Sequence, residues 1–330
     1  MTKMPTTTTV VEYDAAGDAS VLTVRTRPLP PPGPGEVTVE VMTAGLNHID
    51  SFIRAGTESG WADEPWPRAS GSDFAGIVVA VGAGVSRFGK GAEVIGHVRE
   101  GAQATFVTVP AGALATKPRG ITWEQAGGLY LAGATALSTL DELRIGPGDV
   151  LVVSAAAGGV GSIEAQIARH LGAKVIGTCG DRNFDYLRQL GITPVRYGEG
   201  IAKRIRDAAG APVTAMIDNF GQDGADLADE LGVSPSRYRS SADRRDTELR
   251  LLQGDPPSIA QGTQLLERLV ALAERRAFTL LVSGFYAFDD VAEAYDDLAR
   301  LHSRGKIILG MRPVTRVRTL RARDVFEAAK

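Results

Sequence analysis

The stretch from Asp149 to Thr178 constrains the fold more than any other part of the chain. It reads DVLVVSAAAGGVGSIEAQIARHLGAKVIGT, which is an apolar run, a Gly-rich turn, an amphipathic stretch and a second apolar run. Ile163, Ile167 and Leu171 recur every four residues, which places them on one face of a helix. The stretch therefore predicts a strand, a tight turn, a helix and a second strand, which together form one unit of a parallel sheet.

The rest of the chain shows two kinds of pattern. Before Trp123, short apolar runs alternate with Gly and Pro turns, at 37–41, 74–81 and 106–109. This density of short strands is typical of a small barrel-like β domain. After Trp123, strands and helices alternate, with strands at 174–178, 194–197 and 213–218 and a helix at 184–190. The 330 residues are therefore expected to form an α/β protein of two domains.

Several further elements are expected. Residues 122–144 read as two helices interrupted at Gly133. Later in the chain, the patterns predict a helix at 264–276, a strand at 279–285, a helix at 289–301 and a strand at 306–309. The stretch 232–255 is polar and carries five Arg, so it is interpreted either as a mobile surface segment or as a solvated face over a short strand.

Charge and composition exclude several classes of protein. Lys and Arg total 36 against 39 Asp and Glu, a formal net charge of -3, which argues against a general nucleic-acid binder. Cys179 is the single cysteine, so neither a disulfide framework nor a four-cysteine zinc site is expected. The N-terminal MTKMPTTTTVVEY lacks the apolar region of a secretory signal, and no run reaches the ~18 apolar residues of a membrane helix. We therefore expect a cytoplasmic protein with neither nucleic acid nor membrane as partner.

The Gly-rich turn has the chemistry of a phosphate-binding loop. It is an A-x-G-x-x-G motif made of Ala156, Ala157, Gly158, Gly159, Val160 and Gly161. Gly158 lets the backbone approach a pyrophosphate, and Gly161 lets the helix pack closely on the strand. The free N–H groups and the dipole at the helix N-terminus favour an anion. A purely structural Gly turn is the alternative, but the strand before it and the helix and strand after it favour a dinucleotide cofactor.

The end of the second strand indicates which dinucleotide would bind. An NAD site usually has an acidic residue about 20 residues after the motif, whereas this strand ends at Thr178-Cys179-Gly180. Asp181 and Arg182 follow, and a guanidinium pairs well with a 2′-phosphate, for which Cys179 and Gly180 leave room. The sequence therefore favours NADPH, with Arg182 as the phosphate ligand. A solvated Arg182 that Asp181 neutralises is the alternative.

Four stretches together form a specific pattern: AGLNHIDSFIRAG (44–56), GSDFAGIVVAVGAGVSRFGKGAEVIG (71–96), LYLAGATALSTL (129–140) with the Gly turn, and AYDDLARLHSRGKIIL (294–309). The chain resembles the zinc-independent medium-chain dehydrogenases/reductases, in the quinone oxidoreductase and enoyl reductase branch. This resemblance implies a GroES-like β-barrel-type catalytic domain of residues 1–125, completed by 256–330. It also implies a Rossmann NADP-binding domain of residues 126–255 with a doubly wound parallel sheet, and a homodimer or homotetramer.

The resemblance allows the question of zinc to be asked residue by residue. Zinc-dependent relatives use a Cys where this chain has Asn47, a His-Glu pair where it has Ser72-Asp73, and a third ligand near Leu131. An amide, a hydroxyl and an aliphatic side chain do not form the usual tetrahedral site of N and S ligands. No catalytic zinc is therefore expected.

Without zinc, polar donors must stabilise the charge that develops on the substrate oxygen. The resemblance implies hydride transfer from NADPH to a conjugated carbonyl (a quinone, an enone or an enoyl intermediate), with Asn47 donating to the carbonyl oxygen. Asp50 is expected to orient this group or to hold the loop, and an ion pair with Arg54 is the alternative. Tyr130 is a candidate proton donor, although a packing role is favoured for it.

Other positions bear on the cofactor and on the substrate. Three residues match positions that line the cofactor in relatives: Thr135, Tyr197 and Asn219. Phe52 stands where quinone reductases often have a Tyr, so a hydroxyl is missing from the substrate side. The loop at 57–70 carries Trp61 and Trp66, which either line an aromatic pocket or anchor the loop.

Two other functions stay open. The same scaffold fits a non-reductive isomerase or cyclase whose cofactor is structural or lost. It also fits a sensor that binds NADPH without turnover and uses the Arg-rich stretch 237–250 to contact an acidic partner. The abundance of Arg, Ala and Gly is common in proteins of high-GC bacteria and is consistent with a role in secondary metabolism.

Overall fold

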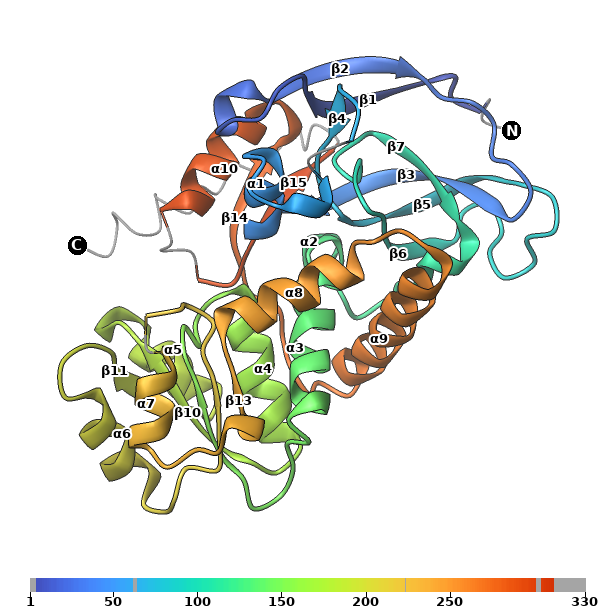
Figure 1. The fold of residues 1–330 in the computed structure, drawn as a ribbon. Coiled ribbons are helices and arrows are strands. Elements are labelled where there is room, and N and C mark those ends of the chain that lie inside the picture. The colour runs from blue at the N-terminus through green and yellow to red at the C-terminus, as the bar shows by residue number, and fades with distance from the viewer. Residues whose placement is uncertain (1–3, 62–63, 223, 301–303, 312–330) are drawn as a thin grey trace. The chain divides into compact units, whose positions relative to one another are not determined.

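The computed structural model describes residues 4–61, 64–222, 224–300 and 304–311. The chain forms two compact units, which are described separately (Figure 1). Unit 1 comprises Met1–Leu131, Arg250–Val270 and Leu281–Lys330, and unit 2 comprises Ala132–Leu249 and Ala271–Leu280.

Unit 1 is built on two β-sheets. The larger has the strand order β14-β15-β3-β5-β6-β8, with β7 paired to β3. Its strands are β3 (Glu36–Gly45), β5 (Asp73–Val81), β6 (Glu93–His97), β7 (Phe106–Pro110), β8 (Leu114–Thr116), β14 (Val282–Ala287) and β15 (Lys306–Gly310). The smaller sheet has the order β2-β1-β4, with β1 (Thr7–Tyr13), β2 (Thr23–Pro28) and β4 (Arg68–Ala69). The first half of the chain is therefore β-rich, as its alternating apolar pattern predicts.

Strand β3 lies at the centre of the core of unit 1. Val37, Val39 and Val41 are buried together with Phe74 and Leu309, so the apolar residues of several strands share one cluster. Strand β15 pairs antiparallel with β3, which brings a late segment of the chain next to an early one. Helices in this unit are α1 (His48–Arg54), α2 (Trp123–Gly127) and α10 (Val291–Ala299), together with most of α9 (Pro256–Glu274).

Unit 2 contains the predicted parallel sheet. Its strand order is β11-β10-β9-β12-β13, and every pair is parallel. The strands are β9 (Val150–Val153), β10 (Lys174–Cys179), β11 (Thr193–Arg196), β12 (Ala215–Ile217) and β13 (Tyr238–Arg239). The helices are α3 (Tyr130–Glu142), α4 (Gly159–His170), α5 (Phe184–Gln189), α6 (Ile201–Ala209), α7 (Gly224–Glu230) and α8 (Ser241–Leu251). The order reverses between β9 and β12, and such a switch point is where open α/β sheets bind ligands.

The predicted helix break at Gly133 is wrong. Gly133 lies inside α3, and the chain breaks between the end of α2 at Gly127 and the start of α3 at Tyr130. A Cβ on Gly128, at the actual break, would lie 2.5 Å from the Cδ1 of Ile308, so a side chain there would require the Ile308 side chain to move. A glycine inside a helix costs only about 1 kcal/mol, which tertiary packing overrides at Gly133.

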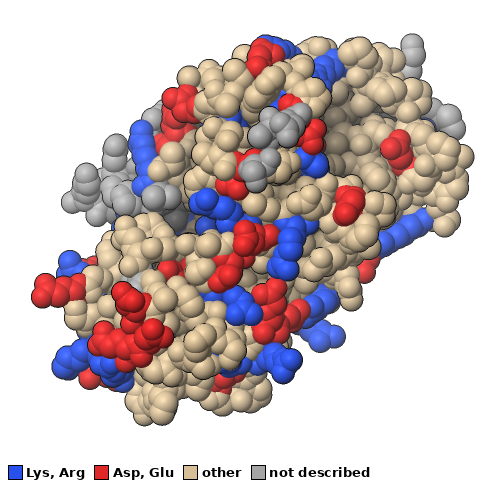
Figure 2. All heavy atoms as spheres, in the orientation of Figure 1, with Lys and Arg blue, Asp and Glu red and all other residues tan. Residues whose placement is uncertain are grey.

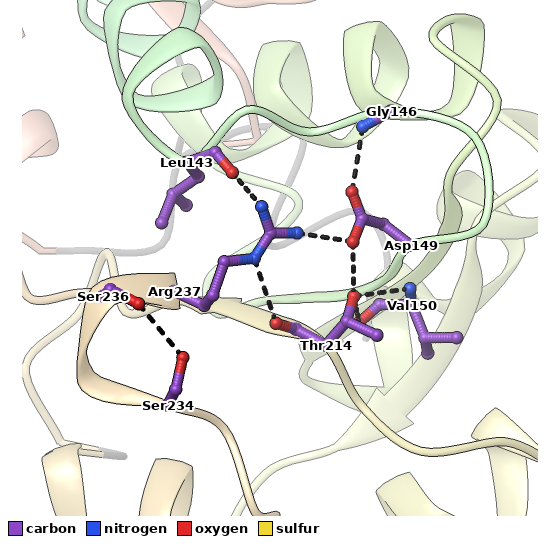
Figure 3. A network of polar contacts seen from close by, with 8 residues as sticks. All are labelled: Leu143, Gly146, Asp149, Val150, Thr214, Ser234, Ser236 and Arg237. Atoms are coloured by element: carbon purple, nitrogen blue, oxygen red, sulfur yellow. Dashed lines mark hydrogen bonds and ion pairs between the residues drawn. The ribbon is translucent and has the colours of Figure 1, made fainter.

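The Arg-rich stretch 232–255 is more ordered than predicted. It contains the expected short strand, β13, but also the helix α8, which was not predicted. Arg237 anchors the stretch, because its guanidinium donates to the carbonyl oxygens of Leu143 and Thr214 and to the carboxylate of Asp149 (Figure 3). This arginine is therefore part of the internal structure of unit 2.

Two more of these arginines also pair within unit 2. Arg239 forms an ion pair with Glu142 at 3.2 Å, and Arg244 forms one with Glu248 at 3.6 Å. In the sensor hypothesis, the stretch 237–250 contacts an acidic partner. Several arginines of this stretch already pair with groups inside unit 2, which weakens that hypothesis.

Later elements differ from the predictions mainly at their ends. Helix α9 begins at Pro256 rather than Gln264, because Asp255 caps its first turn by accepting a hydrogen bond from Ser258 N at 2.9 Å, and proline is tolerated there. Strand β14 begins at Val282 rather than at 279, and α10 at Val291 rather than at 289. Leu301, the predicted end of that helix, lies outside the described residues.

The surface carries both signs of charge. On the face drawn in Figure 2, patches of Lys and Arg side chains lie next to patches of Asp and Glu side chains, with uncharged areas between them, which agrees with the near balance of 36 basic and 39 acidic residues. Among the described residues, no helix has the length and apolar character needed to cross a membrane.

Candidate functional site

The Gly-rich turn connects β9 to α4 in unit 2. Gly158 is the N-cap of α4, and no side chain caps the helix there. The first N–H groups of a helix have no partner within it, so this end presents donors and a positive dipole end to an anion. Ala155 has a φ of +47°, which is unusual for a residue with a side chain and occurs mainly at tight or functional turns.

Gly161 sits where a side chain has no room. A Cβ at this position would lie 2.6 Å from the carbonyl oxygen of Ala155. The close approach lets the first turn of α4 pack directly against the turn that precedes it. A side chain at Gly161 would therefore push the first turn of α4 away from the Gly turn, whereas the motif predicts a close contact of the helix with the strand.

A buried polar network joins the carboxyl ends of β9 and β12. Ser154 Oγ donates to Asp218 Oδ1 at 2.8 Å and accepts a hydrogen bond from Asn219 N at 2.8 Å. Asp218 also accepts the backbone N–H groups of Gly221 at 2.9 Å and Gly224 at 3.1 Å. The network fixes Asn219, a predicted cofactor residue, at the switch point of the sheet.

Glu164 is a buried carboxyl group next to Asn219. It lies on α4 with no exposed surface, and Asn219 Nδ2 donates to its Oε2 at 2.6 Å. Its second oxygen, Oε1, has no hydrogen-bond partner among the described residues. Burial raises the pKa of Glu164 to about 7, although the hydrogen bond from Asn219 opposes the shift.

The raised pKa predicts how Glu164 affects stability. Between its usual pKa and about 7, the folded chain binds more protons at Glu164 than the unfolded chain does, so the free energy of unfolding falls as the pH rises. We expect Glu164→Gln to be more stable than the unmodified chain at pH 8 by on the order of 3 kcal/mol, with a smaller difference at pH 5. Urea unfolding at the two pH values, followed by circular dichroism, measures this.

Glu267→Gln is the matched control, because Glu267 is about half exposed in its ion pair with Arg87. It should leave the pH dependence nearly unchanged. A Glu164→Gln variant whose stability follows that of the unmodified chain at both pH values would contradict the burial argument.

The residues that are predicted to surround the 2′-phosphate of the cofactor lie at the ends of β10 and β11. Cys179 ends β10 and is buried, and Gly180 follows it. Arg182 is exposed in a 3-10 turn at Asp181–Asn183, and Tyr197 is 56% exposed after β11. A Cβ on Gly180 would lie 3.5 Å from the hydroxyl oxygen of Tyr197, so these two residues are close together.

Arg196 is a second arginine on this side that the sequence reasoning missed. It pairs in register with Cys179 across the two strands. Its Nη1 lies 3.4 Å from Asp181 Oδ2, and both side chains are about two-thirds exposed. Asp181 therefore has Arg196 as an ion-pair partner.

Thr135, another predicted cofactor residue, lies inside α3 with no exposed surface. Its hydroxyl oxygen has no hydrogen-bond partner among the described residues. A buried hydroxyl usually finds a partner, so this oxygen is a candidate ligand contact.

In unit 1, the structure brings together the positions that zinc-dependent relatives use. Asn47 caps α1, and its Nδ2 lies 3.5 Å from Ser72 Oγ. Ser72 Oγ donates to Asp73 Oδ1 at 3.0 Å, and the backbone N–H of Leu131 donates to the same oxygen at 3.2 Å. Among the described residues, no group of three or more His, Cys, Asp or Glu is arranged to hold a metal ion.

Lys306 completes this cluster, and sequence reasoning missed it. It is only 5% exposed at the start of β15. Its Nζ donates to Asn47 Oδ1 at 2.5 Å and to the carbonyl oxygen of Leu46 at 2.6 Å. Its positive charge lowers the pKa of Asp73, although burial is the larger effect and raises it above the usual value.

Asp50 is held at the start of α1. It accepts hydrogen bonds from Asn47 N at 2.9 Å and from the Tyr295 hydroxyl at 3.1 Å. Burial raises its pKa to about 7. Arg54, the alternative ion-pair partner, instead donates to the carbonyl oxygen of Asp18, and its guanidinium lies 4.6 Å from the ring centroid of Tyr295. The position of Asp50 therefore supports a role in holding the loop of Asn47.

Tyr130 has the surroundings of a packing residue. It is fully buried, its ring stacks on His97 with centroids 4.0 Å apart, and its hydroxyl donates to the carbonyl oxygen of Leu251 at 3.2 Å. Burial raises its pKa above the usual value. These contacts favour the packing role over proton donation.

The Trp-containing loop is anchored on one side. Trp61 is buried, and the guanidinium groups of Arg68 and Arg99 lie 5.2 Å and 4.0 Å from its ring centroid. Trp66 is 45% exposed and makes an edge contact with Tyr13. Trp61 therefore anchors the loop. The next two residues, Ala62 and Asp63, lie outside the described residues.

Comparison with known proteins agrees with this geometry. Residues 33–119 match the alcohol dehydrogenase GroES-like domain family. The quinone oxidoreductase from Coxiella burnetii superposes with a TM-score of 0.78 at 25% identity and covers 93% of this chain and 100% of its own. The Escherichia coli quinone oxidoreductase complexed with NADPH superposes with a TM-score of 0.76 at 24% identity and covers 92% of this chain and 100% of its own.

Curated relatives include both long and short proteins. A mycocerosic acid synthase-like polyketide synthase of Mycobacterium tuberculosis is 37% identical over 64% of this chain, and the polyketide synthase GfsB of Streptomyces halstedii is 32% identical over 84%. The chain spans only 11% and 5% of these two proteins. A chloroplast envelope quinone oxidoreductase homolog of Arabidopsis thaliana is 26% identical over 86% of this chain and 92% of its own length.

The fold and these matches define an α/β protein with a GroES-like domain and a Rossmann-type parallel sheet, as predicted. The chain belongs to the medium-chain dehydrogenases/reductases, and quinone oxidoreductases are among the proteins that it resembles in sequence and structure.

Proposed function

We propose that this protein is an NADPH-dependent, zinc-free oxidoreductase that transfers a hydride to a conjugated carbonyl compound, such as a quinone, an enone or an enoyl intermediate. The observation that carries the proposal is the start of α4, which has no side-chain cap and opens from a Gly turn at the switch point of a parallel sheet. A helix end of this kind is suited to a pyrophosphate.

The residues of unit 2 fit a nicotinamide dinucleotide. The turn of Ala156, Gly158, Gly159, Val160 and Gly161 would hold the pyrophosphate, and Thr135 and Asn219 would line the cofactor. Cys179, Gly180 and Tyr197 would surround the 2′-phosphate, and Arg182, joined by Arg196, would bind it. The complex of the Escherichia coli quinone oxidoreductase with NADPH supports this cofactor.

In its reduced form, a bound nicotinamide supplies a hydride. The residues of unit 1 would act on the other reactant. Negative charge develops on the carbonyl oxygen of a conjugated substrate as its β-carbon is reduced, and the side-chain N–H groups of Asn47 would donate to that oxygen. Asp50 holds the Asn47 backbone through the capping hydrogen bond at 2.9 Å and so fixes the donor.

The similarity to polyketide synthases supports an acyl-type conjugated carbonyl and a role in secondary metabolism. The similarity to quinone oxidoreductases supports quinones. Both substrate types share the conjugated carbonyl group, so one panel of compounds tests them together.

The experiment is a titration of the purified chain with NADPH and separately with NADH, followed by the nicotinamide absorbance in the presence of quinones and enones. We expect tighter binding of NADPH and its oxidation by at least one compound. Binding without oxidation of NADPH would favour the sensor alternative, and conversion of a substrate without NADPH consumption would favour the isomerase or cyclase. Binding of neither cofactor would overturn the assignment of the Gly turn.

Arg182 is expected to set the preference for NADPH. Arg182→Ala should weaken NADPH binding by roughly 10- to 100-fold, because a charge-assisted contact to the 2′-phosphate contributes about 1.5 to 3 kcal/mol. NADH lacks this phosphate, so its affinity should hardly change. Isothermal titration with both cofactors measures the difference. Arg188→Ala is the control, because Arg188 is exposed on α5 and pairs with Asp185. An equal loss for both cofactors would remove Arg182 from the phosphate site.

A further inference from the structure

Lys306 is a buried cation next to the candidate donor of unit 1. The ammonium group reaches two acceptors, the carbonyl oxygen of Leu46 and Oδ1 of Asn47. Two buried carboxyl groups, Asp50 and Asp73, lie close enough that its charge lowers the pKa of each, against the larger effect of burial. Burying an ammonium group costs free energy, whereas a methionine would bury a stem of similar length without a charge. Packing alone therefore gives no reason for a lysine here.

The contacts of Lys306 fix the direction of the Asn47 amide. An ammonium group only donates, so the amide oxygen must face Nζ and the amide nitrogen must face away. That nitrogen meets Ser72 Oγ at 3.5 Å, which is a long contact. The Ser72 hydroxyl donates its own proton to Asp73, so it can only accept from Asn47. The amide nitrogen of Asn47 also interacts with the Asp73 carboxyl and lowers the pKa of that group, so the amide N–H side faces Ser72 and Asp73.

The chain of donors is also polarised. It begins at the Lys306 ammonium, passes through the amide of Asn47 and the hydroxyl of Ser72, and ends at the Asp73 carboxyl. Each hydrogen bond in such a chain strengthens its neighbours, and the effect of a charge is greater in a buried, low-dielectric setting. A cation on the amide oxygen makes the N–H groups of Asn47 better donors.

We propose that Lys306 is a positioning residue for the substrate carbonyl: it holds the Asn47 amide oxygen, so that the amide N–H groups stay directed toward the substrate oxygen and donate more strongly to it. The inference rests on the proposed function, because it assigns Lys306 to the same site.

The test is a double-mutant cycle of Lys306→Met and Asn47→Ala, measured as kcat and KM for reduction of 2-cyclohexenone and 1,4-benzoquinone by NADPH. We expect Lys306→Met to lower kcat by roughly 10- to 100-fold, as for loss of one oxyanion donor, with little change in the KM for NADPH. The double variant should be no slower than Asn47→Ala. Losses that multiply in the double variant would overturn the proposal, because a purely structural lysine acts independently of Asn47.

A second measurement needs no turnover. The side-chain amide signals of Asn47 in the 15N-labelled chain are identified by their absence in Asn47→Ala. Lys306→Met should shift them, and unshifted signals would overturn the proposal. If Lys306→Met does not fold, the double variant Lys306→Met/Asp73→Asn is used instead in both measurements. This variant also removes the opposite charge at Asp73. If the unmodified chain shows no turnover, the proposed function is contradicted. The proposal for Lys306 is then decided by the amide signals of Asn47.

Discussion

Replacing Gly161 with valine should abolish measurable NADPH binding and destabilise unit 2 by several kcal/mol. The new Cβ would lie 2.6 Å from the carbonyl oxygen of Ala155, and this neighbour is backbone, which cannot rotate away as a flexible side chain would. Overpacking of this kind typically costs about 1 to 3 kcal/mol or more, and a β-branched side chain adds atoms in the same space. The first turn of α4 must then move, and its N–H groups move with it.

Gly146→Val is the matched control in the same unit, because nothing lies within 4 Å of a Cβ at Gly146. Thermal unfolding and titration with NADPH are measured on both variants. We expect the control to bind NADPH as the unmodified chain does. If Gly161→Val binds NADPH normally, the first turn of α4 does not form the pyrophosphate site.

Replacing Arg237 with methionine should lower the free energy of unfolding by roughly 2 to 3 kcal/mol. The guanidinium joins three segments of unit 2, through Leu143 O, Thr214 O and the carboxylate of Asp149 (Figure 3). Its removal leaves a partly buried carboxylate without its cation and two carbonyl oxygens without a donor, and such losses cost more than the contact itself contributes. Urea unfolding measures the change.

The pH dependence of the same variant gives a second reading. Burial raises the pKa of Asp149, but hydrogen bonds from Thr214, Gly146 and Arg237 outweigh burial and lower the pKa below its usual value. A carboxyl group whose pKa is lower in the folded chain than in the unfolded chain stabilises the fold at pH values above the usual pKa of an aspartate. This stabilisation is lost as the pH falls through the lowered pKa. Arg237→Met should therefore lose less stability on acidification than the unmodified chain.

Arg239→Met is the control for this prediction, because Arg239 lies two residues after Arg237, in β13, and forms an ion pair with Glu142 of α3. Its effect should stay below about 1 kcal/mol. Equal stability of Arg237→Met and Arg239→Met would show that the network of Arg237 contributes nothing beyond an ordinary ion pair.

The sequence predicts those features that local periodicity determines. The strand, Gly turn, helix and strand from Asp149 to Thr178 are found at β9, α4 and β10, because each is set by residues within four positions of one another. Helix α8 was missed because its polar sequence has no apolar period. A signal was present, since Ser240 and Asp243 form a reciprocal capping box before it.

The candidate site was only partly predictable. Asn47, Ser72 and Leu131 were placed together by resemblance, and the structure brings them together. Lys306 is 259 positions from Asn47 along the chain, and a lysine before the apolar run IIL reads as an ordinary strand end. Its contact with Asn47 follows from the pairing of β15 with β3, which no local pattern encodes.

Glu164 was missed for a related reason. It stands among the residues of an amphipathic helix, where a glutamate is usually exposed. The structure buries it against Asn219, which comes from the end of a different strand. Buried charges in both units thus depend on contacts between segments far apart in the chain.

The most direct test of the central claim is the fate of deuterium from NADPH labelled at C4 of the nicotinamide. Both C4 isotopomers are supplied in turn with 2-cyclohexenone, and the product is examined by mass spectrometry and NMR. Our account predicts a saturated ketone that carries one deuterium on its β-carbon from one of the two isotopomers. Deuterium on the carbonyl carbon of an allylic alcohol, or a product without deuterium, would contradict hydride transfer to a conjugated carbon.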